Sequence, residues 1–147
     1  MSNILEVQGL KKKYANSDFS LDDISFSLPS GSIMGFVGEN GAGKTTTISC
    51  ILNTLSKDSG EIKIFGQEVS DKNIDIREDI GVVFDAGNFS GSLTAKQISK
   101  IMRGIYKRWD NAVFEKYLTK FCLPFNQKLK TFSKGMSMKL AIAVAYP

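Results

Sequence analysis

Residues 38–45 read Gly38-Glu39-Asn40-Gly41-Ala42-Gly43-Lys44-Thr45, and Thr46 follows. The spacing is Gly-x4-Gly-Lys-Thr, in which glycines let successive backbone N–H groups turn inward as a nest for an anion. A helix that begins at this point adds the positive end of its dipole. Lys44 supplies a point charge, the Thr45 hydroxyl can ligate Mg²⁺, and Thr46 can add a hydrogen bond. The stretch therefore predicts a loop that binds the phosphates of ATP together with Mg²⁺.

The alternative is a chance glycine cluster in a turn, and the flanking sequence argues against it. Residues 33–37 form a short apolar run, which predicts a strand buried on both faces. After the loop, apolar residues recur with helical spacing and predict an amphipathic helix from Lys44 that ends near residues 57–60. These apolar positions are Ile48, Ile51, Leu52 and Leu55. A strand before the loop and a helix after it are the context that a phosphate-binding loop requires.

Further strands are predicted on both sides of this unit. Apolar and polar residues alternate over 24–28, and Pro29-Ser30-Gly31 closes this half-buried strand with a turn. Ile62 and Ile64 predict another strand before a turn at 65–66. Residues 80–84 predict a further buried strand that ends at Asp85.

The last third of the sequence has helical periodicity. Thr94 and Asp110 are predicted N-caps of two helices, and a third helix follows Ser133. Their predicted apolar faces are Ile98, Ile101, Met102 and Ile105; Phe114, Tyr117, Leu118 and Phe121; and Met136, Leu140 and Val144. A strand-rich start, a phosphate loop and a run of helices predict an α/β nucleotide-binding domain with a helical insertion.

Composition narrows the class of protein. The 147 residues carry a net charge of +4, which is too mild to indicate a nucleic-acid partner. Cys50 and Cys122 suit neither a disulfide framework nor a metal-ligand spacing, so both are predicted to be small buried residues. The sequence has no histidine and no apolar run long enough to span a membrane. With no secretory signal at the start, a cytoplasmic protein is expected.

Three features together resemble the nucleotide-binding domain of ATP-binding cassette (ABC) proteins. They are Tyr14, which lies 24 residues before the loop, the stretch 40–46, and Ser133-Lys134-Gly135-Met136. The likeness covers the whole chain in order and is strongest to bacterial transporter ATPases whose signature reads Leu-Ser-Lys-Gly-Met. It implies an α/β fold with a P-loop NTPase core, a strand-rich amino-terminal part and a helical insertion.

The resemblance also assigns the site. It implies that Tyr14 stacks on adenine, where the alternative is an ordinary tyrosine at the end of a strand. Ser133 and Gly135 would face the γ-phosphate held by a partner subunit, where the alternative for Ser133 is a plain helix N-cap. Around them, Phe132, Lys134 and Met136 depart from the commonest pattern, Leu-Ser-Gly-Gly-Gln.

Asp85 is a second departure, because the family usually has glutamine at the end of this strand. A carboxylate there could ligate Mg²⁺ together with Thr45, but without the metal it would repel the γ-phosphate. The alternative is that Asp85 caps the loop that follows.

The family continues past its signature helix into the Walker B strand, which ends in aspartate, and then to a catalytic glutamate and a switch histidine. None of these occurs in the 147 residues. The resemblance thus implies a partial ATP-binding domain, truncated before the Walker B strand. Its expected parts are a strand-rich P-loop core over 1–85, a helical subdomain over 86–135 and the signature helix over 136–147. We expect ATP binding with little or no turnover, and an unpaired sheet edge.

The implied function is that of the ATP-binding subunit of a membrane exporter. Such a subunit pairs head-to-tail with a second ATP-binding domain, contacts a membrane permease subunit and lies in the cytoplasm at the inner face of the cell membrane. Phe89 and Leu93 are candidates for the permease contact, where the alternative is internal packing. The competing function is that of a soluble cassette ATPase acting on ribosomes or DNA. Such proteins usually carry two cassettes, a coiled-coil insertion or strongly basic arms, which this sequence does not show.

Overall fold

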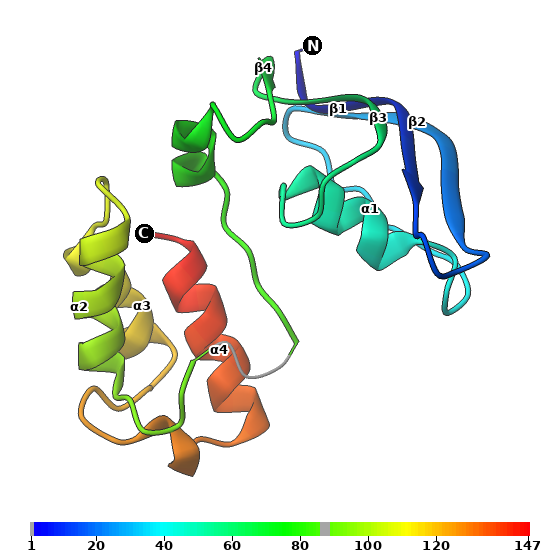
Figure 1. Cartoon of the computed structure of the whole chain (residues 1–147). Coiled ribbons are helices and arrows are strands. Elements are labelled where there is room, and N and C mark those ends of the chain that lie inside the picture. The colour runs from blue at the N-terminus through cyan, green and yellow to red at the C-terminus, as the bar shows by residue number, and fades with distance from the viewer. Residues whose placement is uncertain (1, 86–88) are drawn as a thin grey trace. The chain divides into compact units, whose positions relative to one another are not determined.

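The computed structural model describes residues 2–85 and 89–147, and its contacts divide the chain into two compact units, 1–76 and 77–147. Strands lie in the first unit and a set of helices in the second (Figure 1). The chain is α/β, as predicted from the sequence.

The first unit contains a four-stranded antiparallel sheet with the order β2-β1-β3-β4. Its strands are β1 (Asn3–Lys13), β2 (Ser20–Pro29), β3 (Ser59–Ile64) and β4 (Gln67–Glu68). The predicted alternation in β2 is confirmed, since Ile24, Phe26 and Leu28 are half-buried between exposed serines. The turn after β2 is closed by Ser32, whose amide donates to the Pro29 carbonyl at 3.2 Å.

Helix α1 (Lys44–Ile51) begins where the sequence predicts, but it is shorter than expected and buries a different face. Thr47 and Cys50 are its buried residues, whereas Ile48 is 44% exposed. Thr47 can be buried because its hydroxyl donates to the Gly43 carbonyl at 2.9 Å. Figure 1 shows α1 running below the sheet of the same unit. An eight-residue helix is too short for apolar spacing alone to decide which face packs against the sheet.

The predicted buried strands at 33–37 and 80–84 are not formed. Neither segment pairs with another strand among the described residues, and Ile33 and Val37 are almost fully exposed. An apolar run becomes a buried strand only where a neighbour pairs its N–H and C=O groups and covers its side chains. Phe36 packs instead edge-on against Phe26 of β2, with 5.1 Å between ring centroids.

Three helices form the second unit. They are α2 (Ala95–Ile105), α3 (Asn111–Lys120) and α4 (Lys134–Ala145), with short 3-10 turns η1 (Ile74–Asp79) before them and η2 (Leu129–Thr131) before α4. Their common core consists of Ala95, Ile98, Phe114, Leu118, Leu123, Leu140 and Ala143. No helix in the described part of the chain is long and apolar enough to cross a membrane.

The two predicted N-caps of this unit, Thr94 and Asp110, are confirmed. The Thr94 hydroxyl accepts the Gln97 amide and the Gln97 side chain accepts the Thr94 amide, which is a complete capping box. Asp110 accepts the amides of Ala112 and Val113. Because these caps satisfy N–H groups that have no partner inside the helix, they fix where α2 and α3 begin.

Phe89 and Leu93 are half-buried and pack against the helical core, which favours the alternative of internal packing. The expectation that Cys122 is buried is wrong. Cys122 is exposed, and its backbone is left-handed at φ 55°, because it terminates the turn after α3. On α2, Ile98 is buried as predicted, whereas Ile101 and Ile105 are exposed.

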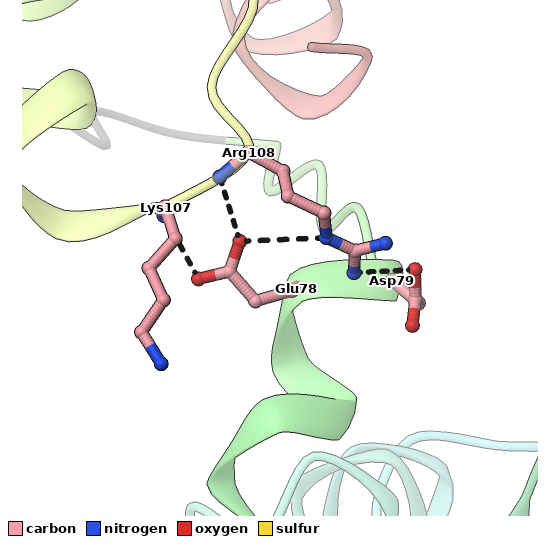
Figure 2. Close-up of polar contacts among 4 residues, drawn as sticks. All are labelled: Glu78, Asp79, Lys107 and Arg108. Carbon is pink, nitrogen blue, oxygen red and sulfur yellow. Dashed lines mark hydrogen bonds and ion pairs between the residues drawn. The ribbon is translucent and has the colours of Figure 1, made fainter.

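Hydrogen bonds and an ion pair connect η1 to the segment between α2 and α3 (Figure 2). The Glu78 carboxylate accepts the backbone amides of Lys107 and Arg108 at 3.1 and 3.3 Å. The Arg108 guanidinium donates to Asp79 at 2.7 Å. The Glu78 side chain is only 16% exposed, so its two amide contacts are shielded from water.

Candidate functional site

The loop between β2 and α1 turns tightly before the helix. The Ala42 amide donates to the Glu39 carbonyl at 3.2 Å, and Gly41 and Gly43 have φ of 87° and 96°. Residues with a side chain rarely adopt these angles, so both glycines are required by the backbone. Gly38 differs from the expectation, since its φ is not left-handed. The reason for glycine here is steric, because a Cβ at position 38 would lie only 3.3 Å from the Ala42 Cβ.

The N-terminus of α1 has no side-chain cap. Its N-cap is Gly43, and no acidic residue lies in the first turn. The first amides of any helix lack partners within the helix and carry a partial positive charge. In α1 these amides follow the glycine turn directly, which is the arrangement that receives an anionic group.

The Lys44 ammonium lies over the same loop. It donates to the carbonyls of Gly38 and Glu39, at 2.5 and 2.7 Å. The charge is therefore held within the ring of loop atoms and does not extend into solvent. The Lys44 ammonium can exchange these carbonyl acceptors for the oxygens of a bound phosphate. Hydrogen bonds to a charged acceptor are stronger, so the exchange is favourable.

Tyr14 lies next to the start of α1. It follows the last residue of β1, and its hydroxyl is 3.3 Å from the Thr46 hydroxyl. Its ring centroid lies 6.1 Å from that of Phe19, and Tyr14 is 36% exposed. The structure thus brings an exposed aromatic face beside the loop, where the sequence prediction puts the nucleobase.

Sequence reasoning missed two side chains that shape the loop. A Cβ on Gly43 would lie 2.4 Å from Leu21 Cδ2 and 3.0 Å from Phe19 Cζ, so both side chains press directly against the loop backbone. The available signal was the alternation of Phe19 and Leu21 at the start of β2. It predicts a strand but not what the strand packs against.

Ser133 and Gly135 stand at the start of α4. The Ser133 hydroxyl accepts the Met136 amide at 3.2 Å, so this serine is an N-cap. Its O–H remains available to donate. A Cβ on Gly135 would meet only the Ser133 oxygen, at 3.9 Å, so packing does not require this glycine. Its absent side chain leaves the first turn of α4 open.

Metal ligands are sparse in the described part of the chain. No group of three or more Asp, Glu, Cys or His side chains gathers there. Asp85 is exposed and lies in the second unit, whereas Thr45 is exposed in the first. A site with few protein ligands suits Mg²⁺, which keeps several waters and binds largely through substrate phosphates. The roles of Thr45 and Asp85 remain predictions.

Comparison of the sequence with models of known protein families identifies its family. The family model described as "ABC transporter" matches residues 21–146. The chain belongs to the ABC transporter family. The curated relatives that the chain matches are described as ATP-binding proteins.

Two relatives show how far the likeness extends. The chain is 36% identical, over 99% of its length, to the bacitracin transport ATP-binding protein BcrA of Bacillus licheniformis, and covers 48% of that protein. A solved structure described as an ATP-binding subunit of an ABC transporter matches 97% of the chain with a TM-score of 0.83 at 28% identity, and 61% of that structure is covered. The chain spans about half the length of the curated relatives it matches.

A third match shares the fold alone. An ATP-binding cassette solved as a dimer in a post-hydrolysis state, with ADP and Pi bound, has a TM-score of 0.79 at 23% identity. It covers 97% of this chain, and this chain covers 68% of it.

Proposed function

We propose that this ABC transporter chain is the nucleotide-binding part of an ATP-binding subunit that couples ATP binding and hydrolysis to transport across a membrane. Residues 38–46 bind the phosphates. The observation that carries the proposal is the N-terminus of α1, which has neither a side-chain cap nor an acidic first turn and holds the Lys44 ammonium beside it. An anion is the ligand that satisfies all of these groups at once.

The decisive experiment removes the Lys44 charge and leaves the glycine turn in place. Lys44→Ala should weaken ATP binding by about a hundredfold or more, because hydrogen bonds from a charged donor are the strong ones. Lys72→Ala is the matched control, since it removes an exposed lysine of the same unit. Titration calorimetry measures both affinities, and equal affinity in the two variants would remove Lys44 from the site.

Tyr14 supplies the surface on which the nucleobase stacks. Its position beside Thr46 supports this assignment, because the base must lie within one nucleoside of the phosphates. Stacking uses the face of the base, so Tyr14→Ala should weaken ATP and GTP alike, by about 1–3 kcal/mol. A loss confined to one of the two nucleotides would point to hydrogen-bond readout of the base edge.

Mg²⁺ is the proposed metal, with Thr45 and Asp85 as its protein ligands. Asp85→Ala should then weaken binding of Mg-ATP but tighten, or leave unchanged, binding of ATP in excess chelator. A carboxylate near a bare triphosphate costs Coulomb energy, and the metal reverses the sign. Equal weakening in both conditions would show that Asp85 is structural.

The proposed assembly pairs two ATP-binding domains head-to-tail and attaches them to a membrane permease subunit at the inner face of the cell membrane. The dimeric cassette of the same fold and the bacitracin-transport relative support this arrangement. Ser133 and Gly135 then contact the γ-phosphate across the dimer, through the free O–H and the open first turn of α4. Recovery of the whole protein with ribosomes or DNA, and not with a permease, would argue for the non-transport alternative.

We further propose that these 147 residues bind ATP without appreciable turnover. The loop holds the ground state, whereas rate depends on groups that orient the attacking water. By resemblance these groups are the Walker B aspartate, the glutamate and the histidine, which the sequence does not contain. Phosphate release no faster than from the Lys44→Ala chain is expected. Faster release would identify another base, with Asp85 the first residue to test.

A further inference from the structure

A groove of about 570 Å³ lies between α2 and α3 in the second unit, far in sequence from the phosphate loop. Three cations of α2 line it, Lys96, Lys100 and Arg103. Their spacing of four and three residues puts them on one face of the helix, over a length of about 10 Å. Its volume is in the range of small-molecule sites.

The ionisable side chains that line the groove are three cations and the one carboxylate Glu115, a net charge of 3 − 1 = +2. In the described part of the chain no ion pair joins any of the three cations to a carboxylate. The one acidic side chain that lines the groove, Glu115, accepts a hydrogen bond from the Asn111 amide at 2.7 Å. Asn111 in turn accepts from the Ser99 hydroxyl. Glu115 keeps its negative charge, but it is hydrogen-bonded to Asn111, and the three cations are not ion-paired within the described residues.

This arrangement costs helix stability. Like charges at i and i+4, such as Lys96 and Lys100, destabilise a helix by a few tenths of a kcal/mol. The whole second unit is basic, with 12 lysines and arginines against 5 aspartates and glutamates in residues 77–147. An anion in the groove would offset the repulsion between these neighbouring charges.

We propose that the groove binds a ligand carrying one or more phosphate groups. Lysine ammonium groups act as point charges for phosphate, and arginine adds a planar fork that matches two of its oxygens. Phe114 and Phe125 also line the groove; Phe114 is fully buried and Phe125 is half-buried. The phosphate can belong to a soluble molecule or to the headgroup of an acidic lipid.

The test uses the chain with Lys44→Ala, so that the nucleotide loop does not compete for the probe. Lys96→Gln with Lys100→Gln removes two groove charges, and Lys116→Gln with Lys139→Gln removes two exposed lysines of the same unit outside the groove. Calorimetry with inorganic tripolyphosphate should show binding that the groove pair weakens about tenfold and the control pair less than about twofold. Circular dichroism checks that both variants remain folded.

A second measurement identifies the source of the phosphate. Flotation with vesicles of phosphatidylcholine, with or without phosphatidylglycerol, tests the lipid. Groove-dependent flotation with the anionic vesicles alone assigns a lipid headgroup, and tripolyphosphate binding without flotation assigns a soluble ligand. The proposal is overturned if tripolyphosphate does not bind, or if both double variants lose affinity for it equally. Polyglutamate is the carboxylate probe, and its binding in the groove without tripolyphosphate binding would show that the groove does not select phosphate. Because the Lys44→Ala background is used throughout, these outcomes are independent of nucleotide binding.

Discussion

The helices of the two units begin in different ways. In the second unit α2, α3 and α4 start at Thr94, Asp110 and Ser133, whose side chains accept the first backbone amides. In the first unit α1 starts at a glycine in the left-handed region, with no side-chain cap. A side-chain cap satisfies amides that have no partner within the helix, as at α2 and α3, for which no ligand is proposed. The amides at the start of α1 have no such cap and are therefore available to the proposed phosphate ligand, whereas α4 combines a cap with a proposed nucleotide contact.

The same contrast extends to loops. The connection between α2 and α3 presents two consecutive amides, and Glu78 accepts both (Figure 2). The loop before α1 also presents amides, but Lys44 is the charged side chain that lies over it. A carboxylate there would occupy the amides that a phosphate needs.

The largest effect is expected from a Cβ in the open N-terminus. Gly43→Ala combines a left-handed φ of 96° with contacts as short as 2.4 Å to Leu21. We expect the loss of about 2–4 kcal/mol of stability in the first unit, together with loss of ATP binding. Gly31→Ala is the control, since its φ is 74° but nothing lies within 4 Å of the added Cβ. Calorimetry and urea unfolding compare the two, and equal effects would mean that packing against the loop is unimportant.

The second-largest effect is expected at Glu78, which accepts two backbone amides of the segment between α2 and α3. Glu78→Gln removes one oxygen that accepts an amide and replaces it with a donor, so about 1–3 kcal/mol of stability should be lost. Arg108→Ala removes mainly the exposed ion pair to Asp79 and should cost less than about 1 kcal/mol. Thermal unfolding measures both. A larger cost for Arg108→Ala would assign the stability of this contact to the ion pair.

Removing a cap should cost less, about 1 kcal/mol for Thr94→Ala or Ser133→Ala. The two caps differ in what else they do. Ser133→Ala should also weaken ATP-dependent dimerisation of the whole protein, because Ser133 is proposed to contact the partner's nucleotide, whereas Thr94→Ala should not. Analytical ultracentrifugation with and without ATP measures this. If both variants dimerise alike, Ser133 is only a cap.

The smallest effect is a pH dependence in the first unit. The backbone amide of Lys13 and the ammonium of Lys12 hold the pKa of Asp58 below its ordinary value. A carboxyl whose pKa is lower in the folded state stabilises the protein above its unfolded pKa. That stability is lost as the pH falls below about 4. Asp58→Asn should flatten the acid limb of the stability profile, and an unchanged limb would exclude this group.

Local features of the sequence predicted what depends on neighbours along the chain. The turn at 38–45, the caps Thr94 and Asp110 and the alternation in strand β2 were all predicted, because turns, caps and strand alternation are set within a few residues. The contact of Tyr14 with Thr46 was approached only through resemblance to a family. No local pattern measures a separation of 32 residues.

Tertiary structure decided which apolar residues are covered. Residues 33–37 and 80–84 have the composition of buried strands, but 33–37 are exposed and 80–84 are exposed or half-buried, whereas Phe89 and Leu93 pack against the helical core. Tertiary packing also buries Thr47 and leaves Ile48 exposed on α1. The same packing puts Phe19 and Leu21 against Gly43. The sequence by itself determines the glycine turn before α1 and the start of each helix, since backbone angles and hydrogen bonds between residues close along the chain specify them. Burial of a side chain depends on packing against residues that are far away in the sequence, and these contacts exist only in the folded chain.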